Sequence, residues 1–475
     1  MVFSSVIFLV YFLPVFLTVY FLTPGKLKNF VLLLFSIFFY AWGAPRFIFV
    51  ILGTTTLDFY LVRLMYNAPD EKKRKLFLIL SLCLNTGLLF YFKYCNFFVD
   101  NFNSLLGAIG VHEISWTKVI LPIGISFYTF ESITYVVDCY RRIHKPLDNF
   151  WQYQLYIILF PKLIAGPIIR YHEIHDQIDD RSANDTIDNK LTGFYRFCLG
   201  LAKKVLIANT MAKIADEIFA LPANELTTGI AWLGMFAYTF QIYFDFSGYS
   251  DMAIGIGKMI GFKFPENFDN PYTSKSITEF WRRWHMTLGN WMKNYLYIPL
   301  GGNKVDSKYK LYFNLWLVFI LSGFWHGAAW TFIIWGIYHG MWLVLERVFL
   351  NKFYQKIGTI PSTIICFLLV AIGWVFFRSE TVSGAFTFIK HLFGIDFNIP
   401  FRFKDQEFKF YFILAILFSF FTCFKIGKII QDKVYYSYYG FTGNTLAFLM
   451  SIILFTLSLA SITSSEFNPF IYFRF

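Results

Sequence analysis

The chain has 475 residues, of which 57% are hydrophobic and only 15% charged, whereas soluble proteins average about 45–50% apolar and about 25% charged residues. This composition excludes a water-soluble globular fold and makes membrane lipid the main surrounding medium. The net charge of +12 does not indicate a nucleic-acid partner, because positive charge in membrane proteins collects in cytoplasmic loops.

Apolar runs recur from Val2 to Ile462, each near the roughly 20 residues that a helix needs to cross a bilayer. The first run, Val2 to Leu22, lacks a basic start and a small-residue cleavage site, so we predict a retained first span. No linker or internal repeat divides the chain. We therefore predict an all-α polytopic membrane protein with a single domain, residues 1–475.

The six cysteines show no CxxC spacing, and most lie inside apolar runs, so we expect neither a metal site nor a disulfide framework. Basic clusters give the topology. Three of them, each separated from the next by two spans, fall on one side of the membrane: Lys26 with Lys28, Lys72 to Lys75, and Arg141 with Arg142 and Lys145. The loop from Phe97 to Thr117 has no Lys or Arg. The positive-inside rule then predicts an extracytoplasmic N-terminus, and the later spans put the tail on the same side.

A longer apolar stretch, Leu311 to Leu345, is flanked by lysines and arginines at both ends. At about 35 residues it exceeds one span and suits a hairpin of two short helices with Gly323 and Gly327 near its tip. His326 lies at this tip. Its imidazole can take a proton from a hydroxyl or thiol and return it, as acyl transfer requires, or it can be a hydrogen-bonded histidine between packed helices. His339, thirteen residues on and on the returning helix, is predicted to pack between helices or to support the residues of the site.

The run Phe280 to Lys293 places Trp281, Trp284, Leu288 and Trp291 at helical spacing, which predicts a helix lying in the membrane interface. Its cations Arg282 and Arg283 can attract the phosphates of a nucleotide-bearing donor or anionic lipid headgroups. His285 follows Trp281 by four positions, where the two faces of such a helix meet, and is a candidate to point toward a reaction chamber.

The segment Gln241 to Asp251 sets two carboxylates and several hydroxyls beside apolar sequence. Such polarity near a membrane indicates either a satisfied network between helices or the lining of a water-filled cavity, and the residues alone leave both open.

Several ordered motifs resemble the membrane-bound O-acyltransferase superfamily, within it the branch of the alginate O-acetylation membrane protein and the peptidoglycan O-acetyltransferase membrane subunit. These motifs are Tyr243 to Asp251, Phe264-Pro265-Glu266-Asn267-Phe268, Phe280 to Asn290, Tyr297 to Asn303, and Trp325-His326-Gly327-Ala328-Ala329-Trp330. Further similar segments, among them Trp374 to Arg378, extend the resemblance over nearly the whole chain.

The resemblance implies a ring of about 11–13 membrane helices around a funnel, with additional interfacial and re-entrant helices. It implies that His326 is the essential catalytic residue and that His285 lies along the same tunnel. The implied donor is acetyl-CoA entering from the cytoplasm, near Arg282 and Arg283. The related D-alanyl branch instead takes its acyl group from a carrier protein.

The tail Asn468 to Phe475 resembles the aromatic C-terminal motif of this machinery, whose tyrosine is proposed to accept the acyl group. A phenol can form an acyl ester and pass it on, so Tyr472 is a candidate relay. An aromatic anchor at the membrane interface is the alternative.

The sequence therefore predicts an O-acetyltransferase of the bacterial plasma membrane that moves acetyl groups outward to a hydroxyl of an envelope polysaccharide. The high content of Phe, Ile, Lys and Asn indicates an AT-rich genome, which mildly favours peptidoglycan over alginate as the acceptor. Because no Gly-Asp-Ser-type esterase segment is present, we expect an extracytoplasmic SGNH-type partner to act on the sugar. The alternatives are D-alanyl transfer to teichoic acid and a transporter, although a transporter would be expected to show an inverted repeat.

Overall fold

A computed structural model describes residues 1–400, 405–435, 439–464 and 467 of the chain. It is 78% helical, and the described residues include no strand. By their internal contacts these residues form two compact units. The first is Met1–Asn184 with Gly261–Phe264, and the second is Asp185–Ile260 with Pro265–Phe475. The single-domain expectation stays a prediction.

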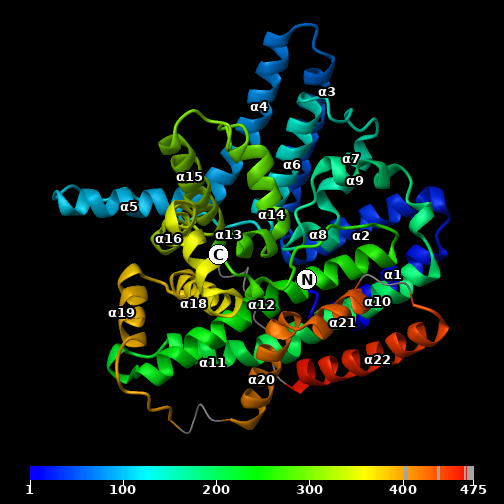
Figure 1. The fold of residues 1–475 in the computed structure, drawn as a ribbon. Coiled ribbons are helices and arrows are strands. Elements are labelled where there is room, and N and C mark those ends of the chain that lie inside the picture. Colours follow the sequence, from blue (N-terminus) through cyan, green and yellow to red (C-terminus); the bar gives the residue numbers. More distant parts are fainter. Residues whose placement is uncertain (401–404, 436–438, 465–466, 468–475) are drawn as a thin grey trace. The chain divides into compact units, whose positions relative to one another are not determined.

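The first unit consists of nine α-helices, drawn from blue to green-cyan in Figure 1: α1 (Leu13–Leu22), α2 (Lys28–Gly43), α3 (Ile48–Asn67), α4 (Glu71–Leu89), α5 (Cys95–Ala108), α6 (Ile125–Tyr140), α7 (Phe150–Ile158), α8 (Phe160–Leu163) and α9 (Tyr171–Asp179). A buried polar cluster joins three of them. Asp58 on α3 accepts hydrogen bonds from Ser81 and Asn85 on α4 and from Tyr153 on α7. Buried carboxylates need such donors in an apolar interior, so this cluster determines how these helices pair.

The second unit contains the remaining α-helices: α10 (Ile187–Ala202), α11 (Asn209–Phe219), α12 (Thr228–Met259), α13 (Ile277–Arg283), α14 (Met286–Trp291), α15 (Lys308–His326), α16 (Trp330–Leu345), α17 (Asn351–Ile357), α18 (Thr359–Arg378), α19 (Val382–Leu392), α20 (Gln406–Phe420), α21 (Lys425–Tyr435) and α22 (Phe441–Ser464). The 32-residue α12 is almost wholly buried and packs against α10, α11 and α18. It is the central element of this unit.

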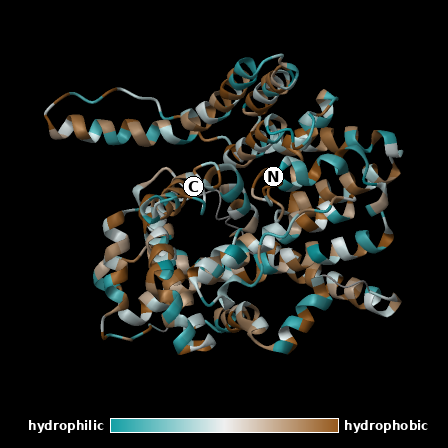
Figure 2. Ribbon diagram, turned by 45° about the horizontal axis from the view of Figure 1, so that its top comes forward, coloured by the Kyte–Doolittle hydropathy of each residue, from teal (hydrophilic) through white to brown (hydrophobic). Residues whose placement is uncertain are grey.

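Within the described residues, seven stretches of helix are long and apolar enough to cross a membrane: Gly25–Gly43, Ile48–Asn67, Glu71–Ala108, Trp330–Ile357, Thr359–Arg378, Gln406–Cys423 and Phe441–Ser464. Large hydrophobic side chains such as Phe49, Ile364 and Leu417 are exposed along them, and Figure 2 shows hydrophobic residues over much of the surface of the long helices. The prediction of an all-α polytopic membrane protein is confirmed. The larger span count and the funnel stay predictions.

Helices α10 and α12 approach each other closely at two pairs of glycines. A Cβ atom added to Gly255 would lie 2.6 Å from the carbonyl oxygen of Gly193, and one added to Gly248 would lie 2.7 Å from that of Gly200. Small residues let helix backbones pack at short distance within a membrane protein. The contact brings the polar residues on the facing sides of α10 and α12 within reach of one another.

The predicted hairpin is present. Helix α15 ends at His326, Gly327 to Ala329 form the connection, and α16 returns beside α15 (Figure 1). Gly323 and Gly336 permit the close contact, because a Cβ added to Gly323 would collide with the carbonyl oxygen of Phe332 and one added to Gly336 with that of Phe319. The hairpin holds His326 at a defined position.

We expect Gly336→Ala to destabilise the protein by about 1–3 kcal/mol, because the new methyl group overpacks the α15–α16 contact. The measurement is the thermal unfolding midpoint in detergent. Gly87→Ala is the matched control, since a Cβ on that helical glycine has no heavy atom within 4 Å. Equal midpoints for the two variants would contradict the close packing of the hairpin.

The single interfacial helix expected from Phe280 to Lys293 is wrong. The segment breaks between α13 and α14, where His285 adopts the left-handed backbone conformation with φ of 45°. The break is stabilised by the preceding loop, since the N–H of Asp269 donates to the Arg283 carbonyl and the N–H of Met286 donates to the Asn267 carbonyl. The assumption of continuous helical spacing therefore gave a wrong position for His285, because the orientation of its side chain depends on this turn.

Candidate active site

His326 is the last residue of α15 and is 7% exposed. Aromatic rings surround its imidazole. The ring centroids of Trp325, Phe377 and Trp335 lie 4.9, 5.2 and 5.4 Å away, from α15, α18 and α16. These side chains shield the imidazole from bulk solvent and restrict its orientation, which is the setting that positioned proton transfer requires.

His285 lies beside His326, with ring centroids 6.4 Å apart. It is 2% exposed and packs edge to face against Phe246 of α12 at 4.6 Å. Its Nδ1 atom is 3.1 Å from the side-chain oxygen of Asn267, and its Nε2 has no hydrogen-bond partner among the described residues. The structure thus brings together the two histidines that the sequence analysis singled out.

The protonation state of His285 follows from this burial. Desolvation lowers its pKa well below the usual range, and the nearby His326 adds to the effect. A buried imidazole next to a second one is therefore neutral at pH 7. A neutral histidine keeps a lone pair on one nitrogen and can accept a proton.

Arg282 and Arg283 differ in exposure and in their hydrogen-bond and ion-pair partners. Arg282 is exposed, and Arg283 pairs with Glu279 at 2.6 Å and donates to the Thr273 hydroxyl at 3.2 Å. Both residues are at the end of α13, immediately before the turn that carries His285. Arg283 is held in place by its partners, while the side chain of Arg282 extends to the surface.

A second group of charges joins α10, α12 and the loop before α13. Arg196 of α10 donates to Asp251 at 2.9 Å and forms a two-pronged contact with Glu266, while Lys203 bonds the other Asp251 oxygen at 2.6 Å. The Tyr435 ring of α21 covers both cations, at 4.9 Å from Arg196 and 5.5 Å from Lys203. The two positive and two negative charges balance, and each charged group has an oppositely charged partner, as buried charges require.

This cluster forms the polar wall of a cavity of about 570 Å³. Most of the remaining lining is apolar, with residues of α20, α21 and α22 that include Leu417, Phe418 and Leu454. Asn267 also lines the cavity, and the same side chain is in hydrogen-bond contact with His285. A volume of this size can hold an elongated, mostly apolar ligand.

The carboxylates of the segment Gln241 to Asp251 form ion pairs between helices, and part of the segment also lines the cavity. Asp245 pairs with Lys204 at 2.8 Å and Asp251 with Arg196 and Lys203, which makes a network between helices. Ser247 and Asp251 also line the cavity. The close α10–α12 contact is what allows both.

The two remaining residues singled out from the sequence are His339, which the structure describes, and Tyr472, which it does not. His339 on α16 is fully buried among Trp281, Trp335 and Trp374, and neither ring nitrogen has a hydrogen-bond partner within the described residues. This environment is that of a packing residue. Tyr472 lies outside the described residues.

Sequence reasoning missed the residues that support the site. Asn267 and Glu266 stand in the Phe264 to Phe268 motif, which was quoted only for the resemblance, and Arg196 and Lys203 were not considered at all. The available signal was the occurrence of cations on α10 and carboxylates on α12 inside otherwise apolar sequence, because such charges need partners.

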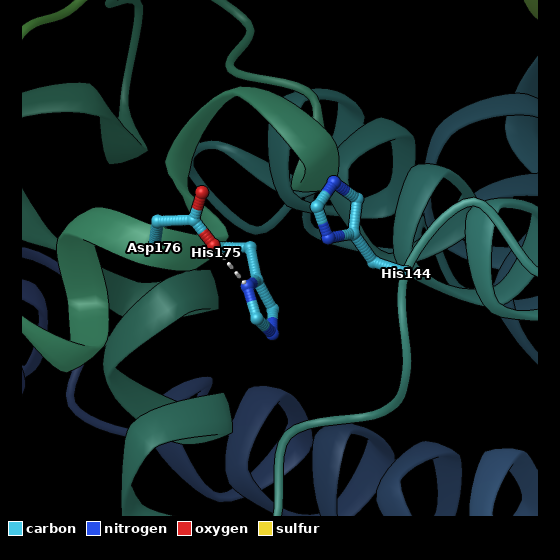
Figure 3. A group of neighbouring side chains, drawn as sticks. All are labelled: His144, His175 and Asp176. Carbon is cyan, nitrogen blue, oxygen red and sulfur yellow. Dashed lines mark hydrogen bonds and ion pairs between the residues drawn. The ribbon is translucent and has the colours of Figure 1, made fainter.

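The first unit contains one group of potential metal ligands among the described residues: His144, His175 and Asp176, whose ligand atoms lie within 4.8 Å of one another. Figure 3 shows His175 bonded to Asp176 at 2.9 Å, with His144 approaching from the connection between α6 and α7. The buried Tyr171 holds that connection by donating to the Lys145 carbonyl at 2.6 Å. Asp176 is exposed, and its bond to His175 lowers its pKa.

Comparison of the amino-acid sequence with those of known proteins identifies the family of this chain. The model of the membrane-bound O-acyltransferase family matches residues 144–379, which include both histidines of the pair. A probable alginate O-acetylase of Pseudomonas aeruginosa is 46% identical over 395 residues, covering 83% of this chain and 75% of that protein. The chain belongs to the membrane-bound O-acyltransferase family.

The names of other relatives indicate different polymers as their acceptors. A peptidoglycan O-acetyltransferase of Helicobacter pylori is 37% identical over 430 residues, covering 83% of this chain and 80% of that protein. A teichoic acid D-alanyltransferase of Bacillus subtilis is 29% identical over 273 residues, covering 55% of this chain and 68% of that protein. The present chain is accordingly an enzyme, an O-acyltransferase that passes through the membrane several times, and the relatives named for acetyl transfer are the more similar ones.

Proposed function

We propose that the protein transfers acetyl groups from cytoplasmic acetyl-CoA, across the bacterial plasma membrane, to the hydroxyls of an envelope polysaccharide. The single observation that carries this proposal is the buried pair of His285 and His326 in a chain similar to named O-acetylases. Peptidoglycan is the preferred acceptor on composition, with an alginate-type polymer next.

In the proposed reaction His326 is the general base. It takes the proton of the acceptor hydroxyl as the oxygen attacks the thioester carbonyl, and the CoA sulfur leaves with the electrons of the broken C–S bond. The protonated imidazole then returns its proton to that sulfur. The aromatic rings around His326 support this role, because they hold the imidazole in place and shield it from bulk solvent.

The donor's arm is proposed to occupy the cavity beside Asn267. Its mostly apolar wall suits a pantetheine chain, and the Arg196 and Lys203 cluster gives that chain's amides polar partners. Arg282, which has no ion pair among the described residues, remains a candidate for the donor's phosphates together with Arg283. The lysines of α21 are proposed to face the cytoplasm, in keeping with the positive-inside rule.

On the outer side, Tyr472 or an SGNH-type partner is proposed to receive the acetyl group. Both termini are proposed to be extracytoplasmic. A tail tyrosine on that side could form an acyl ester and pass it to the partner, which would then acetylate the sugar.

The test uses the purified full-length protein in nanodiscs with acetyl-labelled CoA, together with mass spectrometry of envelope glycans from cells with and without the gene. We expect labelled acetyl transfer in vitro and loss of O-acetyl groups from one glycan in the deleted cells. No acetyl transfer in either experiment would contradict the proposal.

D-alanyl transfer is the second candidate, because a teichoic acid D-alanyltransferase is among the relatives. It predicts D-alanyl esters on the envelope polymer and a carrier protein as the donor. Uptake of an intact solute without acetyl transfer would instead favour a transporter.

A further inference from the structure

Asn267 is fully buried between the cavity and the histidine pair, and both polar atoms of its side chain make hydrogen bonds. Its side-chain oxygen lies 3.3 Å from the backbone nitrogen of Thr287, 2.9 Å from the Thr287 hydroxyl and 3.1 Å from Nδ1 of His285. Its side-chain nitrogen donates to the Ser250 hydroxyl at 3.0 Å.

The orientation of this amide follows from one unambiguous donor. A backbone N–H can only donate, so the atom of Asn267 that faces the Thr287 N–H must be the oxygen. The amide nitrogen then faces Ser250, whose hydroxyl can accept. The side chain cannot flip without setting two donors against each other.

The same oxygen determines the tautomer of His285. Because it can only accept, Nδ1 of His285 must carry the proton and donate. In a neutral imidazole the other nitrogen, Nε2, then holds a lone pair. This Nε2 is buried and has no hydrogen-bond partner among the described residues.

We propose that Asn267 is a positioning residue that holds His285 as the Nδ1–H tautomer, with the lone pair of Nε2 available to the His326 side of the site. The meaning of this arrangement for catalysis rests on the proposed function. Centroids 6.4 Å apart are too distant for a direct ring-to-ring hydrogen bond and close enough for one water to bridge the two rings.

When His326 takes the proton of the acceptor, a positive charge appears next to His285. A neutral His285 avoids repulsion between two imidazolium ions, and its Nε2 accepts a hydrogen bond from a water to which the His326 imidazolium donates. The opposite tautomer would present an N–H to that water. Asn267 thus raises the basicity of His326 without touching the substrate.

The experiment compares Asn267→Leu, which removes the acceptor at similar volume, with Asn267→Asp, which keeps an oxygen for His285 and Thr287. We expect Asn267→Leu to lower kcat at least tenfold with little change in KM for acetyl-CoA. Asn267→Asp should retain most of the activity, and its added negative charge should move the acidic limb of the pH–rate profile to higher pH. Asn314→Leu is the matched buried-amide control, because Asn314 bonds the Leu300 carbonyl and contacts neither histidine.

A second readout does not depend on activity. In protein labelled with ¹⁵N-histidine in nanodiscs, assigned by the loss of a signal in His285→Gln, we expect Nδ1 of His285 to be protonated and Nε2 to be unprotonated. A protonated Nε2 in neutral wild-type His285, or equal activity of Asn267→Leu and the wild type, would overturn the proposal. A wild-type protein with the expected tautomer and no acetyl transfer would overturn the proposed function instead.

Discussion

Replacing His326 by alanine is expected to abolish acetyl transfer while the protein stays folded. Positioned general bases contribute about 10²- to 10⁴-fold to a rate, and the alanine methyl group cannot accept a proton. His326 is at the end of α15, so its removal leaves the close glycine contacts of the hairpin unchanged. The measurement is transfer from labelled acetyl-CoA by purified protein, with thermal unfolding measured in parallel.

His339→Leu is the matched control for this prediction. His339 is also a buried histidine of the hairpin, yet it lies among tryptophans and has no hydrogen-bond partner within the described residues. We expect this variant to keep transfer within a few-fold of the wild type. Loss of activity in His339→Leu but not in His326→Ala would contradict the prediction, because it would make His339 the essential histidine and His326 the packing residue.

A large effect on stability is expected from breaking the buried ion pair of Lys204 and Asp245. Both side chains are 2% exposed and their charged atoms are 2.8 Å apart. Lys204→Met leaves the Asp245 carboxylate in an apolar interior without its cation, which typically costs about 3–5 kcal/mol. We expect a lower thermal midpoint in detergent, and poor yield if the loss exceeds the total stability.

The double variant Lys204→Met with Asp245→Leu separates charge from packing. Replacing a whole buried pair by apolar side chains of similar size is often neutral or stabilising, so the double variant should recover most of the loss. Additive destabilisation in the double variant would show that the two residues act through other contacts.

Several features of this protein were predictable because they depend on local sequence. Apolar run length predicts membrane helices irrespective of their neighbours, and the α15–α16 hairpin follows from a stretch too long for one span with glycines at its centre. His326 was identifiable for the same reason, since an ionisable side chain at such a position is costly unless it has a role.

The support of the site was not predictable in this way. The turn at His285 depends on hydrogen bonds from a loop 16 or more residues earlier, and helical periodicity carries no information about it. The ion pairs of Arg196 with Asp251 and Glu266 join residues 55 and 70 positions apart. Such pairings depend on helix packing, here on the glycine contacts of α10 and α12.

By itself, the amino-acid sequence determined that this protein lies in a membrane, which stretches can span it, and that His326 and His285 are candidates for chemistry. These properties follow from hydrophobicity and from the cost of burying ionisable groups, both of which are carried by individual residues. Only the tertiary structure decided that the two histidines are neighbours and that Asn267 orients one of them. Distances and hydrogen-bond direction arise from contacts between segments remote in the chain, which residue composition does not encode.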